Sequence, residues 1–140
     1  MKISINTGVE NIDIERNGKI VGAVSFSLSD PALLDRLRNV QTKAKEIEAG
    51  NRLGQIEDIE EALDEAKRID GEIRALLDWA FGYPVSEIVF GDSFSFTTDG
   101  GVTALEQFLE GVMPYIGERF AAETEAAKQR QAKYLEKYKR

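Results

Sequence analysis

The chain has 140 residues, of which 42% are hydrophobic and 31% charged, and its net charge is −7. A chain of this length and composition can bury the core of a single domain, residues 1–140, without disulfides or a structural metal. It contains no cysteine and no histidine. This excludes Ser/His and Cys/His nucleophilic sites, disulfides and zinc sites of the common Cys/His type, so carboxylate chemistry is the enzymatic class that remains.

The first residues of the chain, MKISINTGVENIDIE, alternate apolar and polar side chains, whereas a signal peptide needs a continuous apolar core. No later stretch approaches the roughly 18 apolar residues of a membrane-spanning helix. We therefore expect a cytoplasmic protein with no membrane partner. The acidic net charge disfavours nucleic acid as a partner.

Residues 1–28 are predicted to form a β-ribbon. Asn17-Gly18 is the strongest short signal for a tight hairpin turn, because both residues tolerate a positive φ. A two-residue loop places Ile14 opposite Val21, and Ile12 opposite Ala23.

The second strand of this ribbon has apolar residues on both faces. Ile20, Val24 and Phe26 fall on the face opposite to Val21 and Ala23. A strand of this kind is covered twice or paired again, and the segment around Ile3 and Ile5 is a candidate for that pairing.

Residues 30–81 are predicted to form an antiparallel helical hairpin. Ser29-Asp30-Pro31 is a helix start, and a break follows at residues 50–54. The second helix ends at Gly82 and Pro84. Apolar residues recur at spacings of three and four in two stripes: Leu33, Leu37, Val40, Ala44 and Ile47, then Ile56, Ile59, Leu63, Ala66, Ile69, Ile73, Leu76 and Ala80.

Residues 82–100 are predicted to be irregular, with at most a short helix at residues 86–90. Half of the twelve aromatic residues lie between positions 79 and 96. We expect Trp79 and Phe90 in the core, and Tyr83 and Phe94 at least partly exposed. The segment either plugs the core or presents a surface to a partner helix, and the candidate contacts are Tyr83, Phe94 and Phe96.

Residues 101–140 are predicted to form a C-terminal helix that ends in a basic tail. From Lys128 to Arg140 there are six basic residues and one acid, so the tail carries +5 and the rest of the chain −12. Tyr134, Leu135 and Tyr138 share one helical stripe with Ala127 and Gln131. The tail is either solvated or a docking helix that binds a partner or a second copy, with nucleic-acid contact a disfavoured third interpretation.

Residues 57–65 form an acidic cluster that contains Glu60, Glu61 and four other carboxylates. Helical nucleotide pyrophosphohydrolases hold a divalent metal with such residues, which is the enzymatic alternative for this chain. A solvated helix face explains the same pattern, since acids are favoured in the first turns of a helix. No phosphate-loop or dinucleotide motif is present, so we expect no cofactor, no catalytic residues and no metal ligands.

The order of these parts resembles that of phage tail assembly chaperones. The resemblance rests on the β-ribbon opening, the acidic helical middle and the stretch FGYPVSEIVFGDSFSFTTDGGVTALEQFLEGVMPYIGERF from Phe81 to Phe120. It implies a non-enzymatic helper in the host cytoplasm that coats the tape-measure protein and engages the tail-tube protein. An ordinary structural coiled-coil virion protein is a third interpretation.

Overall fold

The structure is a computed structural model that describes residues 1–138. About 59% of the chain is helical and 15% lies in strands, which confirms the predicted mainly α, α+β class. The strands β1 Val9–Arg16 and β2 Lys19–Ser27 form an N-terminal antiparallel hairpin. Helices α1 Leu33–Ala49 and α2 Ile59–Phe81 follow, then the short helix α3 Ser86–Phe90 and the long helix α4 Ala104–Lys137.

The turn of the β-hairpin is the predicted one, since Asn17 and Gly18 have φ values of 52° and 82°. The predicted register is wrong, however. Ile14 lies opposite Gly22 and Ile12 opposite Val24, because an irregularity in the pairing between Ile14 and Glu15 inserts one extra residue, Val21, into β2. The bulge turns Val24 to the same face as Ile12.

The corrected register gives the hairpin one apolar face. Val24 and Phe26 are buried, and Ile12 and Ile14 pack against the core. Ile20 stays exposed. The predicted pairing of the Ile3 and Ile5 segment does not occur within residues 1–138, because the sheet has two strands only.

The helical hairpin is antiparallel, as predicted. Arg36, near the start of α1, donates from Nε to the carbonyl of Ala80 at the end of α2 over 2.8 Å. The connection between the two helices spans residues 50–58 and contains the 3-10 helix η1 Leu53–Gln55. Asp58 caps α2 by accepting from the Glu61 amide over 3.1 Å, and Gly82 ends it with a φ of 81°.

Helix α4 begins at Ala104, three residues after the predicted start, because Gly100-Gly101 is the turn of a second small hairpin, β3 Thr98–Asp99 and β4 Val102–Thr103. The Thr103 hydroxyl caps α4 by accepting from the Glu106 amide. Residues 139–140 of the predicted helix lie outside the described residues. Within residues 1–138, no helix combines the length and the apolar character needed to cross a membrane.

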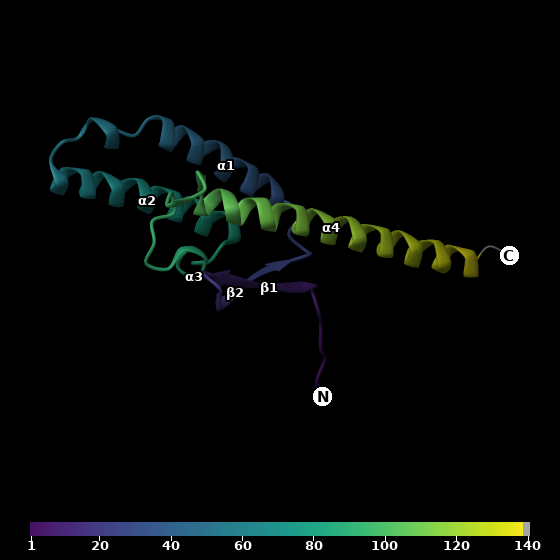
Figure 1. Ribbon diagram of the computed structural model, residues 1–140. Coiled ribbons are helices and arrows are strands. Elements are labelled where there is room, and N and C mark those ends of the chain that lie inside the picture. Colours follow the sequence, from purple (N-terminus) through teal and green to yellow (C-terminus); the bar gives the residue numbers. More distant parts are fainter. Residues whose placement is uncertain (139–140) are drawn as a thin grey trace.

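The first half of α4 lies between the helical hairpin and the β-hairpin, and its second half projects from the body (Figure 1). Phe26 of β2 packs edge-on against Tyr115 of α4, with ring centroids 6.2 Å apart. The core combines the following buried side chains: Val24, Phe26, Leu33, Leu37, Val40, Ala44, Ile69, Ile73, Leu77, Ala80, Val85, Val89, Phe90, Leu105, Leu109, Val112 and Ile116.

Candidate protein-binding surfaces

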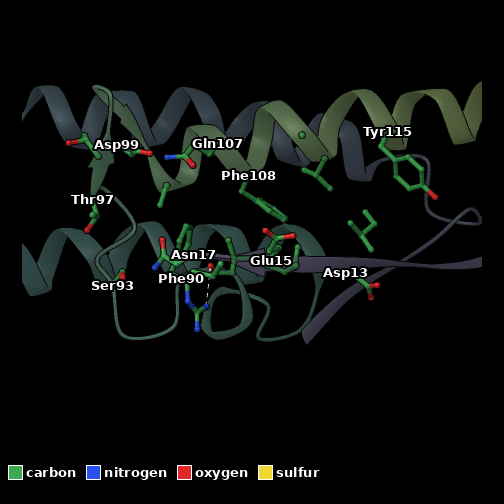
Figure 2. Close-up of a pocket in the computed structure, with 18 residues that line it drawn as sticks. Asp13, Glu15, Asn17, Phe90, Ser93, Thr97, Asp99, Gln107, Phe108 and Tyr115 are labelled. Carbon is green, nitrogen blue, oxygen red and sulfur yellow. Dashed lines mark hydrogen bonds between the residues drawn. The ribbon is translucent and has the colours of Figure 1, made fainter. Parts of the chain in front are cut away.

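A groove of about 840 Å³ separates the β-hairpin from the first turns of α4 (Figure 2). Residues 12–17 of β1 and its turn form one wall, and residues 104–115 of α4 form the other. The end of α3 and the loop at residues 93–99 close one end. The groove therefore lies where four separate segments of the chain meet.

Apolar side chains line the interior of the groove, and acids line its rim. Ile12, Phe108 and Tyr115 are partly exposed and line the interior. Asp13, Glu15 and Asp99 are the exposed acids among the residues that line the groove, and Figure 2 labels all three. An apolar interior with a negative rim suits an apolar segment that carries a positive charge.

Two arginines fix the position of β1 beside the groove. Arg16 donates from Nη1 to the carbonyl of Ile88 at the end of α3 over 2.9 Å. Arg119 of α4 donates to the Glu10 carboxylate over 2.6 Å. This hydrogen bond and the charge of Glu10 raise the pKa of the Arg119 guanidinium above its ordinary value.

Tyr83, predicted as a contact residue, lies half-buried against β2 instead of in the groove. Its hydroxyl accepts from the Ser25 amide over 2.6 Å and donates to the Ser25 carbonyl over 3.3 Å. The side chain thus satisfies the backbone N–H and C=O of Ser25 at the outer edge of β2. Its partial exposure agrees with the prediction.

Phe94 and Phe96 stack on each other in the loop before β3, with ring centroids 5.1 Å apart and planes 6° from parallel. Both are partly buried, and Phe96 packs against the core. The prediction of a partly exposed Phe94 is confirmed. Phe90, also as predicted, is fully buried.

The loop that carries these two rings is held by a pair of charges on α2 that the sequence analysis missed. Arg74 donates from Nη2 to the carbonyls of Gly91 and Ser93, each over 2.7 Å. Asp70 accepts from the Ser95 amide over 2.6 Å and also binds Arg74. The spacing of four between Asp70 and Arg74 was a visible signal for their ion pair, but the loop they hold is distant in sequence.

The prediction that Trp79 is buried is wrong: 53% of the surface of this residue is exposed. The buried face of α2 runs through Ile73, Leu77 and Ala80, and Trp79 lies off that face. Its ring lines a shallow cleft of about 420 Å³ between α1 and α2, beside Ile47 and Leu76.

The three candidate residues of the tail lie together on the projecting half of α4. Tyr134, Leu135 and Tyr138 are all exposed, and the two tyrosine rings lie 5.0 Å apart. From Ala121 to Tyr138 every described side chain is exposed. The structure therefore places these residues far from the aromatic segment and provides them with no covering element in residues 1–138 (Figure 1).

The acidic cluster of α2 is mostly exposed, with one exception. Glu65 is buried and binds Arg68 over 2.5 Å and Arg52 over 3.7 Å, and the hydrogen bond from Arg68 lowers its pKa. Asp58 caps the helix. Across residues 1–138, no group of three or more carboxylates is arranged to hold a metal ion.

No protein-family model, no curated protein and no solved structure matches this chain.

Proposed function

We propose that this protein is a non-enzymatic assembly chaperone of the phage tail type, which acts in the cytoplasm of the bacterial host by binding the tape-measure and tail-tube proteins. The observation that carries the proposal is the projecting half of α4. A helix whose side chains are all exposed over residues 121–138 adds nothing to the core of its own chain. We infer that this half of the helix contacts another chain.

The projecting helix has the features of a docking element. Tyr134, Leu135 and Tyr138 form an exposed apolar stripe, which water solvates poorly. Four cations lie on the same stretch of α4: Lys128, Arg130, Lys133 and Lys137. A partner helix with apolar residues and acids would cover the stripe and pair with the cations, as in helix-in-groove recognition.

The resemblance of residues 81–120 to phage tail chaperones supplies the identity of the partner. The resemblance implies a helper that coats the tape-measure protein. A small protein with a projecting helix and an exposed apolar stripe suits that task, because several copies can attach along one long partner. The gene order offers a direct check: the proposal expects a tail-tube gene upstream and a very long tape-measure gene downstream.

The biochemical test is co-expression of this chain with the neighbouring tape-measure protein. We expect the tape-measure protein to become soluble and to co-purify with the chain. The double variant Tyr134→Ser/Tyr138→Ser should abolish co-purification. The double variant Gln129→Ser/Ala132→Ser changes the opposite face of the same helix and should bind as the natural chain does.

A tape-measure protein whose solubility does not depend on this chain would contradict the proposal. Equal loss of binding in both double variants would instead show that helix stability, rather than the tyrosine stripe, governs the interaction. Circular dichroism of all variants separates the two cases, because serine lowers helix propensity at Gln129 and Ala132 but has about the same propensity as the tyrosines that it replaces.

A further inference from the structure

The two edges of the β-hairpin differ in whether their backbone groups have partners. Tyr83 occupies the outer edge of β2 at Ser25. The outer edge of β1 pairs with no strand in residues 1–138. An uncovered strand edge is a template for pairing with another extended chain.

The bond between Tyr83 and Ser25 shows which residues of β1 offer their backbone at this edge. In an antiparallel pair of strands, the backbone N–H and C=O groups of two opposite residues either bond to each other or both point away from the partner strand. The backbone groups of Ser25 point away from β1, toward Tyr83, and Ser25 lies opposite Asn11. Asn11 and, two residues on, Asp13 therefore direct their N–H and C=O groups toward the free edge.

The groove runs along this same edge. A cavity over one face of a strand is lined by alternate residues, whereas this groove is lined by the consecutive residues 12–17 and by no residue of β2. A strand added at the edge would lie inside the groove. One of its faces would meet Phe108 and Tyr115 of α4, and the other would lie beside Asp13 and Glu15.

Residues 2–7 have the composition that this position requires. Ile3 and Ile5 alternate with polar residues, and they are 75% and 81% exposed. Lys2 supplies a positive charge on the opposite face of the segment. Six extended residues span about 20 Å, which matches the length of β1 that lines the groove.

The segment cannot reach the groove of its own chain without breaking existing bonds. Leu28 donates to the Gly8 carbonyl over 2.9 Å, and the Ser27 hydroxyl donates to the Thr7 carbonyl over 3.2 Å. These bonds continue the pairing with β2 backward past Val9. Figure 1 shows the N-terminal segment leading away from the body from this point.

We propose that residues 2–7 of a second copy bind in this groove as a third strand on the free edge of β1. Ile3 and Ile5 cover Phe108 and Tyr115, while Lys2 lies toward the acids of the rim. The occupant is a second copy because its segment combines an exposed apolar pair with a charge that complements Asp13 and Glu15. This assembly is independent of the tail interaction proposed above.

The acceptor edge is tested with two substitutions at one exposed position. Asp13→Pro removes the N–H that faces the groove but no bond between β1 and β2, and edge strands tolerate proline. Asp13→Ala removes the same carboxylate and keeps the N–H. In analytical ultracentrifugation we expect the natural chain and Asp13→Ala to exceed the 15.6 kDa monomer mass, and Asp13→Pro to sediment as a monomer.

The donor segment is tested with Ile3→Asp/Ile5→Asp, which should also be monomeric. Mixing this variant with Asp13→Pro should restore a complex, because the first retains an intact groove and the second an intact segment. A synthetic peptide of residues 1–8 should bind the donor variant, and binding should slow hydrogen exchange at the amides of Asn11 and Asp13. This measurement leaves β1 unaltered and so does not depend on the folding of Asp13→Pro.

Three results would overturn the proposal: a natural chain that is monomeric at millimolar concentration, assembly that survives both the donor and acceptor variants, or a peptide that leaves the two amides unprotected. A chain truncated after Ala127 should still assemble, because it keeps both the segment and the groove. Loss of assembly in the truncated chain alone would assign self-association to the tail.

Discussion

Removal of a single hydroxyl group, in Tyr83→Phe, tests whether the closed edge of β2 stabilises the fold. The ring stays in place, but the hydroxyl that accepts from the Ser25 amide over 2.6 Å is lost. The substitution leaves a partly buried N–H and C=O without their partner. A loss of this kind costs about 1–2 kcal/mol in the free energy of unfolding.

The expected change in melting temperature follows from the length of the chain. The entropy of unfolding is about 2.1 cal/mol/K per residue, or about 0.3 kcal/mol/K for 140 residues. A cost of about 1–2 kcal/mol therefore lowers the melting temperature by about 3–7 °C. Thermal unfolding measures this shift directly when it is followed by circular dichroism at about 222 nm, where helices dominate the signal.

Tyr115→Phe is the matched control. The Tyr115 ring packs against Phe26, but its hydroxyl makes no hydrogen bond with residues 1–138. We expect its melting temperature to stay within about 2 °C of the natural value, since no hydrogen bond is lost. Equal melting temperatures for Tyr83→Phe and the natural protein, or equal losses of melting temperature in the two variants, would show that the Tyr83 hydroxyl does not stabilise the fold.

Three further measurements test other features of the structure. The fluorescence of Trp79, the only tryptophan, should be quenched by acrylamide in the folded chain. Trp79→Ala should lower the free energy of unfolding by less than the roughly 3–5 kcal/mol expected for a fully buried tryptophan. Fluorescence that resists quenching in the folded chain would show that the ring is buried. Burial first, and then the charge of Glu106, raises the pKa of Glu48 above 4.5, so ionised Glu48 penalises the folded state as the pH rises past that value. Glu48→Gln should therefore raise the melting temperature at pH 7, with the gain fading below pH 4.5, and a gain that is equal at both pH values would contradict this cause. A chain that ends at Ala127 should melt within a few degrees of the natural chain, because residues 128–138 are exposed, and its unfolding would place the tail in the core.

The sequence by itself determined the features that depend on neighbouring residues. Asn17-Gly18 adopts the positive φ values of a hairpin turn, Gly82 ends α2, and a short helix occupies residues 86–90. Each of these outcomes follows from the backbone preferences of a few adjacent residues. The mainly helical class follows in the same way from the long apolar stripes.

Tertiary structure decided the features that depend on residues distant in sequence. The turn alone would give the predicted register. Packing against α3 and α4 favours the bulge at Val21 instead, and this bulge determines which face of β2 is buried. Trp79 is adjacent to buried Ala80 in sequence, yet packing against α1 buries the face that contains Leu77 and leaves the indole exposed.

The groove belongs to this second group, because its walls come from residues 12–17 and 104–115. No local pattern brings these segments together. The same holds for Tyr83, whose hydroxyl closes the edge of a strand that lies 58 positions earlier in the chain. Local preferences act over a few residues, whereas the positions of strand edges and cavities follow from how whole elements pack, and packing joins residues from any part of the chain.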